Sequence, residues 1–478
     1  MGEIDFFSLG DIFFIGKKEI KMKRALIRSI TFFYLLFFCF LPAFSQNEEK
    51  KIGNPFGLGI GLGAETFNEE EGTITWQSLS LTPELTLGKF GIGLDLTLHF
   101  RFTGGENKNE FDIREKDWIP ESSTLKDILS VYLPKLRYVR YGYKGEPLFV
   151  MLGSIENATL GNGFIMGGYA NTMFLPEKRL FGLSFDLDGR LFNFPYLGVE
   201  TFIANLALFD LMGGRLYVRP LIGTEIPILK NLEVGGTVVG DRLPYYYVED
   251  GDFDGDGEPD TGHALVAGGD VRLPLLNLPV FTLTTFADIA FEQAHVGGML
   301  GLGGRLLKII PYRGEIRLLG RNFIPVYFDS TYDLYRPLKH KILTGEGDIP
   351  GFVGWLFGTG ISVLDDKLSL YASLDGPFKK PEPENLNNFN NYPHLQALFK
   401  LEEDLIPGFF FTLSYDKKFI RKFGDLIDPE GANVGVSLNI KNGPAVITLF
   451  YTLRYNPALK EIPRWETTSG LKSSLSLF

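Results

Sequence analysis

The stretch 90–102 alternates strictly between two kinds of residue. Every second residue from Phe90 onward is Phe, Ile or Leu, and the residues between them are Gly, Asp, Thr, His and Arg. Because successive side chains of a β-strand point to opposite faces, such a strand has one apolar and one polar face. The alternation extends over the roughly ten residues that a tilted strand needs to cross a bilayer. A half-buried strand of a soluble sandwich is the alternative for any single stretch of this kind.

The same alternation recurs along most of the chain. It predicts roughly twenty strands, and for a barrel we expect an even number of about 16–20. The candidates include 56–67, 73–88, 181–192, 197–211, 216–225, 264–275, 281–292, 312–325 and 445–456. Few amphipathic helices are available to cover so many apolar faces, so lipid is the simplest cover. The sequence therefore predicts an all-β fold, a single transmembrane antiparallel up-and-down β-barrel, whose closure removes unpaired strand edges.

The first 45 residues have the pattern of a signal peptide. A basic stretch ends at Arg28, residues 30–44 are apolar, and Ala43 and Ser45 are the small residues of a cleavage-like triplet. We therefore assign residues 1–45 to an N-terminal extension and signal peptide, and residues 46–478 to the barrel. The sole cysteine, Cys39, lies in the apolar stretch, so the exported chain is predicted to have no disulfide.

The charge balance of the chain is acidic, with a formal net charge of −11. Residues 1–45 contain six Lys or Arg and four Asp or Glu, so their removal changes the net charge to −13. A surplus of negative charge argues against a nucleic-acid partner.

The C-terminal residue is Phe478, an aromatic residue at the end of the last strand candidate, 470–478. In this the chain resembles the Gram-negative-type outer-membrane β-barrel family, the porin-like proteins. The resemblance implies residence in the cell outer membrane, contact with its lipid bilayer, and recognition of Phe478 by the barrel-assembly machinery. One departure is that Leu471, Leu475 and Leu477 have the opposite parity to Phe478.

Five long loops are expected between the strands, at 103–133, 155–180, 243–263, 326–350 and 379–394. Apolar residues near 125–133 have helical spacing, which predicts a short helix there. The loop 155–180 is unusually apolar and includes Phe164, Met166 and Tyr169. Since such a loop would not be left in water, we expect it to fold into the lumen as a gate or constriction. Two further short strands are the alternative.

Residues of the polar parity are expected to line the lumen of such a barrel. The candidate pore-lining residues are Asp95, Arg101, Arg313, Glu315, Arg317 and Arg321, four of them from the single stretch 312–325. A row of arginines would favour anionic or dipolar solutes in a water-filled pore. The alternative is an interior of ion pairs that merely packs a narrow barrel.

The sharpest local motif is an acidic loop at 252–260. Asp252, Asp254, Asp256 and Asp260 occupy relative positions 1, 3, 5 and 9, and a glycine stands at position 6. Several carboxylates around a sharp turn suit a hard cation such as Ca²⁺. The pattern resembles thrombospondin type-3 and EF-hand-like calcium loops, which implies a structural Ca²⁺. A solvated acidic turn is the alternative.

No catalytic motif is evident in the sequence. The five histidines are scattered, and neither a G-x-S-x-G nor an H-E-x-x-H pattern occurs, so we expect no enzyme. The expected function is a porin-like channel that lets small solutes pass by diffusion, with a calcium-binding-like surface loop. A surface-interaction or structural barrel, or a transporter of hydrophobic compounds gated by 155–180, are alternatives. The sequence is compatible both with a monomer and with a homo-oligomer.

Overall fold

The computed structural model describes residues 55–69, 72–105, 108–347, 349–379, 392–459 and 464–476. The predicted signal peptide, most of the predicted loop 379–394, and Phe478 lie outside the described residues.

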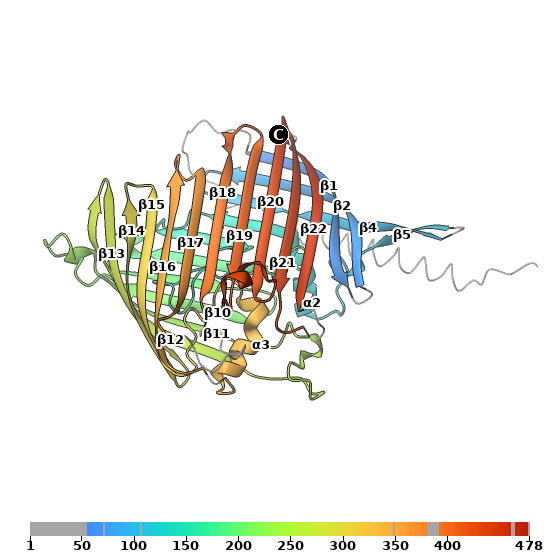
Figure 1. Cartoon of the computed structure of the whole chain (residues 1–478). Helices are drawn as coiled ribbons and strands as arrows, with labels where there is room; N and C mark the ends of the chain where they lie inside the picture. The colour runs from blue at the N-terminus through green and yellow to red at the C-terminus, as the bar shows by residue number, and fades with distance from the viewer. Residues whose placement is uncertain are drawn as a thin grey trace, which may run out of the picture.

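The chain is all-β and forms one closed antiparallel up-and-down barrel (Figure 1). The strands are β1 (Phe56–Glu69), β2 (Gly72–Leu87), β3 (Phe90–Leu94), β4 (Leu96–Gly105), β5 (Lys108–Ile113), β6 (Leu136–Tyr141), β7 (Leu148–Gly153), β8 (Gly182–Asp188), β9 (Leu197–Ile203), β10 (Leu211–Val218), β11 (Glu233–Asp241), β12 (Ala264–Leu278), β13 (Phe281–Glu292), β14 (His295–Leu306), β15 (Ile310–Leu319), β16 (Phe352–Val363), β17 (Leu368–Pro377), β18 (His394–Ile406), β19 (Phe409–Lys417), β20 (Ala432–Asn442), β21 (Ala445–Tyr455) and β22 (Trp465–Ser476).

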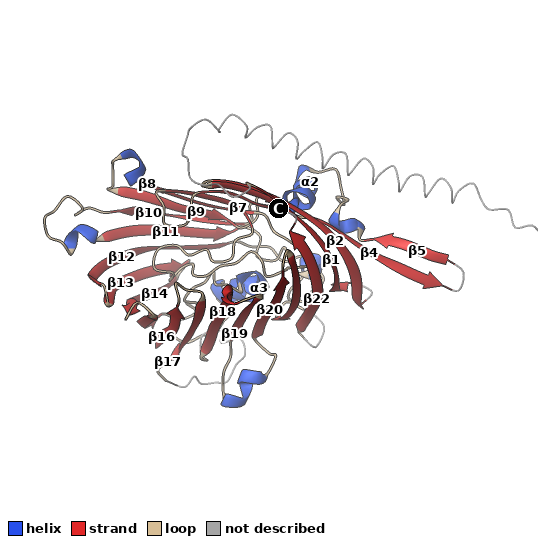
Figure 2. Cartoon of the chain, turned by 90° about the horizontal axis from the view of Figure 1, so that it is seen from above, coloured by secondary structure: helices blue, strands red, loops and turns tan. Residues whose placement is uncertain are grey.

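Closure comes from the pairing of β1 with β22, in the register Gly59 with Ser476 through Glu65 with Gly470. Strands β3 and β4 both pair with β2 and form one interrupted strand of the wall, while β3 continues the ring to β6. The β4–β5 hairpin projects away from the barrel (Figures 1 and 2). The closed wall therefore has 20 strands, within the predicted range.

The outer face of the wall is apolar, as the alternation predicts. Large apolar side chains are exposed on successive strands, among them Leu265, Ile289, Leu300, Ile316 and Phe357. Their neighbours along the strands, such as Asp270 and Arg317, are buried on the inner side. Such a face is stable against hydrocarbon, and a closed barrel leaves no backbone polar group of its wall unpaired there.

The two ends of the barrel differ in the length of their connections. Short turns join the strands at the end where β1 begins and β22 ends, for example 88–89, 279–280, 407–408 and 443–444. We call this the chain-end side. The long connections 114–135, 154–181, 242–263 and 320–351 lie at the opposite end, which we call the loop side and which is at the bottom of Figure 1.

Two α-helices lie in long loop-side connections. Helix α2 (Leu125–Tyr132) confirms the predicted short helix, and Thr124 caps it by accepting a hydrogen bond from the Asp127 N–H at 3.3 Å. Helix α3 (Tyr332–Leu343) lies within the predicted loop 326–350. Among the described residues no helix is long and apolar enough to cross a bilayer. The 3-10 helices are η2 (Glu115–Asp117), η3 (Leu133–Lys135), η4 (Gly189–Phe192), η5 (Leu229–Asn231), η6 (Glu249–Gly251) and η7 (Phe423–Ile427).

Two predicted strands in the stretch 197–225 had wrong boundaries. The predicted strand 197–211 is split, because the Asn205 side chain accepts a hydrogen bond from the Ala207 N–H at 3.0 Å and starts a turn after β9. The predicted strand 216–225 starts inside β10, which ends at Val218, just before Pro220. In both cases apolar residues continued to alternate through a turn.

Three further boundaries differ from the sequence interpretation. The stretch 90–102 is broken at Asp95, whose carboxylate pairs with Arg179 at 2.6 Å. The predicted loop 103–133 contains the end of β4 and all of β5. The predicted strand 312–325 ends at Leu319, because the chain turns into the lumen there, and Arg321 therefore lies beyond the strand.

Candidate functional site

Two loop-side connections, 154–181 and 320–351, fold into the barrel and together form a plug (Figure 2). The predicted gate residues lie in its core: Phe164 is 1% exposed, and Met166 and Tyr169 are 0% exposed. The alternative of two further strands in 155–180 is wrong, because the described residues of this segment make only isolated bridges.

The two plug segments pack directly on each other. The ring of Phe164 stacks on Phe323, with centroids 5.5 Å apart, and Met166 forms a parallel bridge with Phe328. The Tyr169 hydroxyl donates to the Asp333 carboxylate at 3.2 Å. Burial raises the pKa of the Tyr169 phenol well above its usual value, so this hydroxyl keeps its proton and remains a donor.

The apolar core of the plug lies in the loop-side half of the lumen. This core continues into apolar wall residues near the loop-side ends of the strands, including Phe202, Leu211, Val239, Val266, Ala290 and Leu319. Apolar packing of this kind excludes water from the core of the plug.

The tip of segment 154–181 reaches charged residues of the wall. Arg272 donates to the Gly161 carbonyl at 2.5 Å and to the Asn162 side-chain oxygen at 2.9 Å. The Asn162 side-chain nitrogen donates to Asp288 at 2.8 Å, and Arg313 donates to the Asn162 carbonyl at 2.6 Å. Two arginines and one aspartate of the wall therefore hold the tip.

The returning part of the same segment is held on the other side of the barrel. Arg454 of β21 donates to the Met173 carbonyl at 2.6 Å and pairs with Glu177 at 2.8 Å. Arg179 then pairs with Asp95, between β3 and β4. Segment 154–181 thus extends across the lumen and is fastened at both walls.

Helix α3 is held by a fully buried arginine. The Arg336 guanidinium contacts Asp333 at 2.7 Å, Asp210 at 2.7 Å and Asp241 at 3.5 Å, and all four side chains are 0% exposed. The Tyr332 hydroxyl also donates to Asp241, at 2.8 Å. Three carboxylates share one cation, and burial raises the pKa of Asp333 to about 6.

A second ionic group ties the plug to β19. Lys339 and Lys418 both contact Asp329, at 3.2 and 2.9 Å, and Lys418 also contacts Asp416 at 3.7 Å. Burial lowers the pKa of Lys339 to about 8. His394 continues the chain of charges, since it lies 3.0 Å from Asp416.

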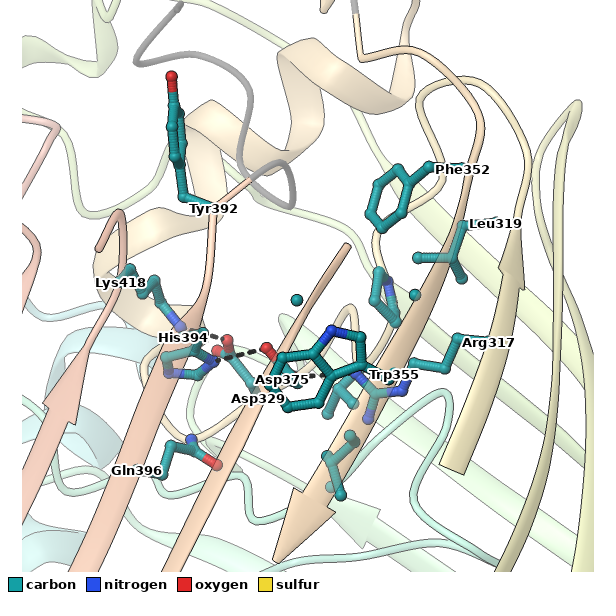
Figure 3. Close-up of a pocket in the computed structure, with 16 residues that line it drawn as sticks. Arg317, Leu319, Asp329, Phe352, Trp355, Asp375, Tyr392, His394, Gln396 and Lys418 are labelled. Atoms are coloured by element: carbon teal, nitrogen blue, oxygen red, sulfur yellow. Dashed lines mark hydrogen bonds and ion pairs between the residues drawn. The ribbon is translucent and has the colours of Figure 1, made fainter. Parts of the chain in front are cut away.

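This ionic group borders a small cavity of about 80 Å³, large enough for a few water molecules. Figure 3 shows Arg317 on one side of the cavity and Lys418 and His394 on the other, with Asp329 and Asp375 between them. Arg317 pairs with Asp375 at 2.9 Å. Opposite charges therefore alternate around the cavity.

The six predicted pore-lining residues do not gather at one place. Arg313, Glu315 and Arg317 form one cluster on β15, where Glu315 accepts from both arginines, and Arg317 is only 4% exposed. Asp95 pairs with Arg179, and Arg101 pairs with Asp112 at 3.0 Å. Arg321 is exposed beyond β15. Arg313, Glu315 and Arg317 of β15 therefore have partners in the wall, and Arg313 also contacts the plug.

The acidic loop brings three of its four predicted ligands together. One carboxylate oxygen each from Asp252, Asp254 and Asp260 lies within 4.8 Å of the others, and Asp256 is not in this group. Lys341 of α3 lies 3.6 Å from Asp254. The acidic loop therefore contacts the plug.

Sequence reasoning missed segment 320–351 as part of the plug. The signal was a dense group of aromatic residues, now buried: Phe323, Tyr327, Phe328, Tyr332 and Tyr335. The same criterion that identified 155–180, an apolar loop that water would not solvate, applies to this run.

No protein-family model matches the sequence, and no curated protein matches it. Solved structures to which the chain is similar include three proteins from Pseudomonas aeruginosa. They are the outer membrane protein OprD (9% identity, 88% of this chain and 93% of that chain, TM-score 0.32), OpdL (10% identity, 89% and 99%, TM-score 0.32) and a variant of the ferric enterobactin receptor in complex with enterobactin (7% identity, 90% and 82%, TM-score 0.36). At such identities and TM-scores, these similarities assign no function to this chain. An argument for its function has to start from its own barrel and plug.

Proposed function

We propose that the chain is an outer-membrane channel through which small polar solutes diffuse, and that the plug keeps the channel closed at rest. The channel has no catalytic step in this proposal. The bilayer covers the apolar outer face, and the barrel-assembly machinery recognises the C-terminal Phe478.

One observation carries this proposal: a closed wall of 20 strands is apolar outside and charged inside. A barrel of 16 or more strands is too wide for wall side chains to fill its lumen. Here the apolar core of the inward-folded segments lies in the loop-side half, and only the tip of 154–181 reaches farther. Cavities of about 720 and 300 Å³ lie toward the chain-end side, and a third of about 540 Å³ lies between β6, β7 and residues 154–158 of the plug.

Removal of the gate segment tests the proposal. Gly153 and Gly182 are register partners in β7 and β8, so a two-residue Asn-Gly turn can replace 154–181 without a change in the wall. We expect this variant to have a several-fold higher single-channel conductance than the wild type in planar bilayers, because the segment crosses the lumen.

Trimming of the β4–β5 hairpin provides the matched control. Phe102 and Phe111 are register partners, and the hairpin projects away from the barrel, so a two-residue turn that replaces 103–110 should leave the conductance unchanged. A segment-deleted barrel that folds, inserts and stays silent would contradict the channel proposal.

We further propose that the acidic loop binds a structural Ca²⁺ through Asp252, Asp254 and Asp260. Three carboxylates within 4.8 Å offer the oxygen ligands that this ion prefers. The affinity is expected to be that of extracellular modules, about 10⁻⁴–10⁻³ M. Lys341, now beside Asp254, would then have to share that carboxylate with the ion. A calcium-stabilised acidic loop favours a second candidate function, in which the barrel binds a surface partner through its loops.

Proteolysis of the loop 242–263 tests for calcium. Millimolar Ca²⁺ is expected to slow cleavage of the wild-type loop, and Asp254→Asn should abolish that protection because it removes one of the three ligands. Asp256→Asn is the matched control, since it removes a neighbouring charge outside the group of three. Equal protection of the wild type and Asp254→Asn would refute the site.

A further inference from the structure

An open cavity of the lumen is rich in basic side chains. It has a volume of about 720 Å³ and lies in the chain-end half, beside the connection 219–232 and strands β12 and β13. Its charged lining residues are Arg190, Arg219, Lys230, Arg272 and Glu233. We call it the basic basin.

Carboxylates near the basin do not balance its positive charge. Arg190 and Arg219 share Asp188, at 3.0 and 2.8 Å, and Arg219 also lies 3.4 Å from Glu233. Glu233 is in turn shared with the fully buried Arg215, at 2.9 Å. Within the described part of the chain, Lys230 and Arg272 have no ion pair with a carboxylate.

Arg272 faces both the basin and the plug. Among the residues that the structure describes, its guanidinium donates only to uncharged oxygens of the plug tip, the Gly161 carbonyl and the Asn162 amide. A hydrogen bond from arginine to a carboxylate or phosphate is roughly twice as strong as one to a neutral acceptor. An anion in the basin would therefore compete with the plug tip for Arg272.

We propose that the basic basin binds a small solute bearing an oxyanion group, a carboxylate or phosphate, and that capture of Arg272 by this group releases the tip of segment 154–181. The proposal rests on the channel function and adds the class of solute and the event that opens the gate. It also implies a direction. The solute reaches the basin from the chain-end side, because the plug fills the other half of the lumen.

Inorganic phosphate is the probe for this proposal, applied from the chain-end side of oriented channels in planar bilayers. Phosphate is expected to raise the open probability of the wild type by about tenfold. In Arg272→Gln the resting open probability should already be higher, and phosphate should have no effect. Arg272→Lys keeps the charge but loses the two-pronged geometry, so a weakened response is expected.

Hydrogen exchange of residues 157–168 gives a second measurement, which does not depend on conduction. Phosphate should speed exchange there in the wild type and not in Arg272→Gln. Arg305→Gln is the control for both measurements, because Arg305 lines none of the three cavities and pairs with Asp366 in an exposed position.

The outcomes separate this proposal from the channel function. If the segment-deleted variant conducts, while phosphate changes neither the open probability nor the exchange of the wild type, the basin proposal is overturned and the channel function stands. If that variant is silent, the channel function fails. In that case, phosphate that speeds hydrogen exchange of residues 157–168 in the wild type, but not in Arg272→Gln, would still support anion binding at Arg272.

Discussion

Replacement of Arg336 by methionine is expected to release α3 from the lumen. The substitution leaves Asp210, Asp241 and Asp333 buried without their shared cation. Breaking a buried ion pair by removal of one partner costs about 3–5 kcal/mol, which corresponds to a hundredfold or larger shift toward the undocked plug. The barrel wall should persist, because its strand pairing does not involve α3.

Two measurements check this result. Protease cleavage within 320–351 should become at least tenfold faster, and openings should become frequent in planar bilayers. Arg305→Met is the matched control, since it removes an arginine from the exposed pair with Asp366, where such pairs contribute about 1 kcal/mol or less. If protease cleaves 320–351 in Arg336→Met as slowly as in the wild type, the ionic cluster does not hold the plug.

The second large effect is a dependence of plug docking on pH. Burial raises the pKa of Asp333 from 3.8 to about 6, although Arg336 opposes the shift. Between pH 3.8 and about 6 the docked plug binds more protons than the undocked plug, so docking strengthens as the pH falls from about 6 toward 4 and is nearly independent of pH above about 7. The shift corresponds to a change of about a hundredfold at most in the docking equilibrium.

The open probability between pH 7 and pH 4 measures this effect. The occasional openings of the wild type should become rarer on acidification, with the change developing below about pH 6, and Asp333→Asn should lack this change because its amide cannot ionise. The other charged groups facing Asp333 are Arg336 and Asp210, and the hydroxyl of Tyr169 donates to it. Asp366→Asn, at an exposed position, is the control. A wild-type channel that opens on acidification would reverse the sign and refute the role of Asp333.

Local sequence patterns predicted the structure correctly where neighbouring residues determine it. Alternation placed Leu300 and Ile316 on the outer face and their neighbours inside, because the strand itself imposes a period of two. The apolar character of Phe164 and Met166 was enough to place their loop in the lumen, where the structure has it. Alternation misled at Asn205 and Leu319, where a side-chain hydrogen bond or a turn into the lumen ends the strand.

The partners of the lumen charges could not be predicted, because they come from distant parts of the chain. Arg336 meets Asp210, 126 residues away, and Arg272 meets Gly161, 111 residues away. The β15 arginines illustrate the consequence. The sequence predicts that Arg313 and Arg317 line a pore, and the structure adds their partners, which are Glu315, Asp375 and the plug tip.

Some features of this protein are determined by local residue order, and others by contacts between distant residues. Its strand-forming pattern, its apolar outer face and the inward folding of 155–180 follow from residue order, because solvation and backbone geometry act locally. Closure of 20 strands, the docking of α3 and the pairing of each buried charge depend on contacts between residues far apart in the chain. Only the tertiary structure supplies those contacts, since the free energy of a buried charge depends on which partner lies beside it.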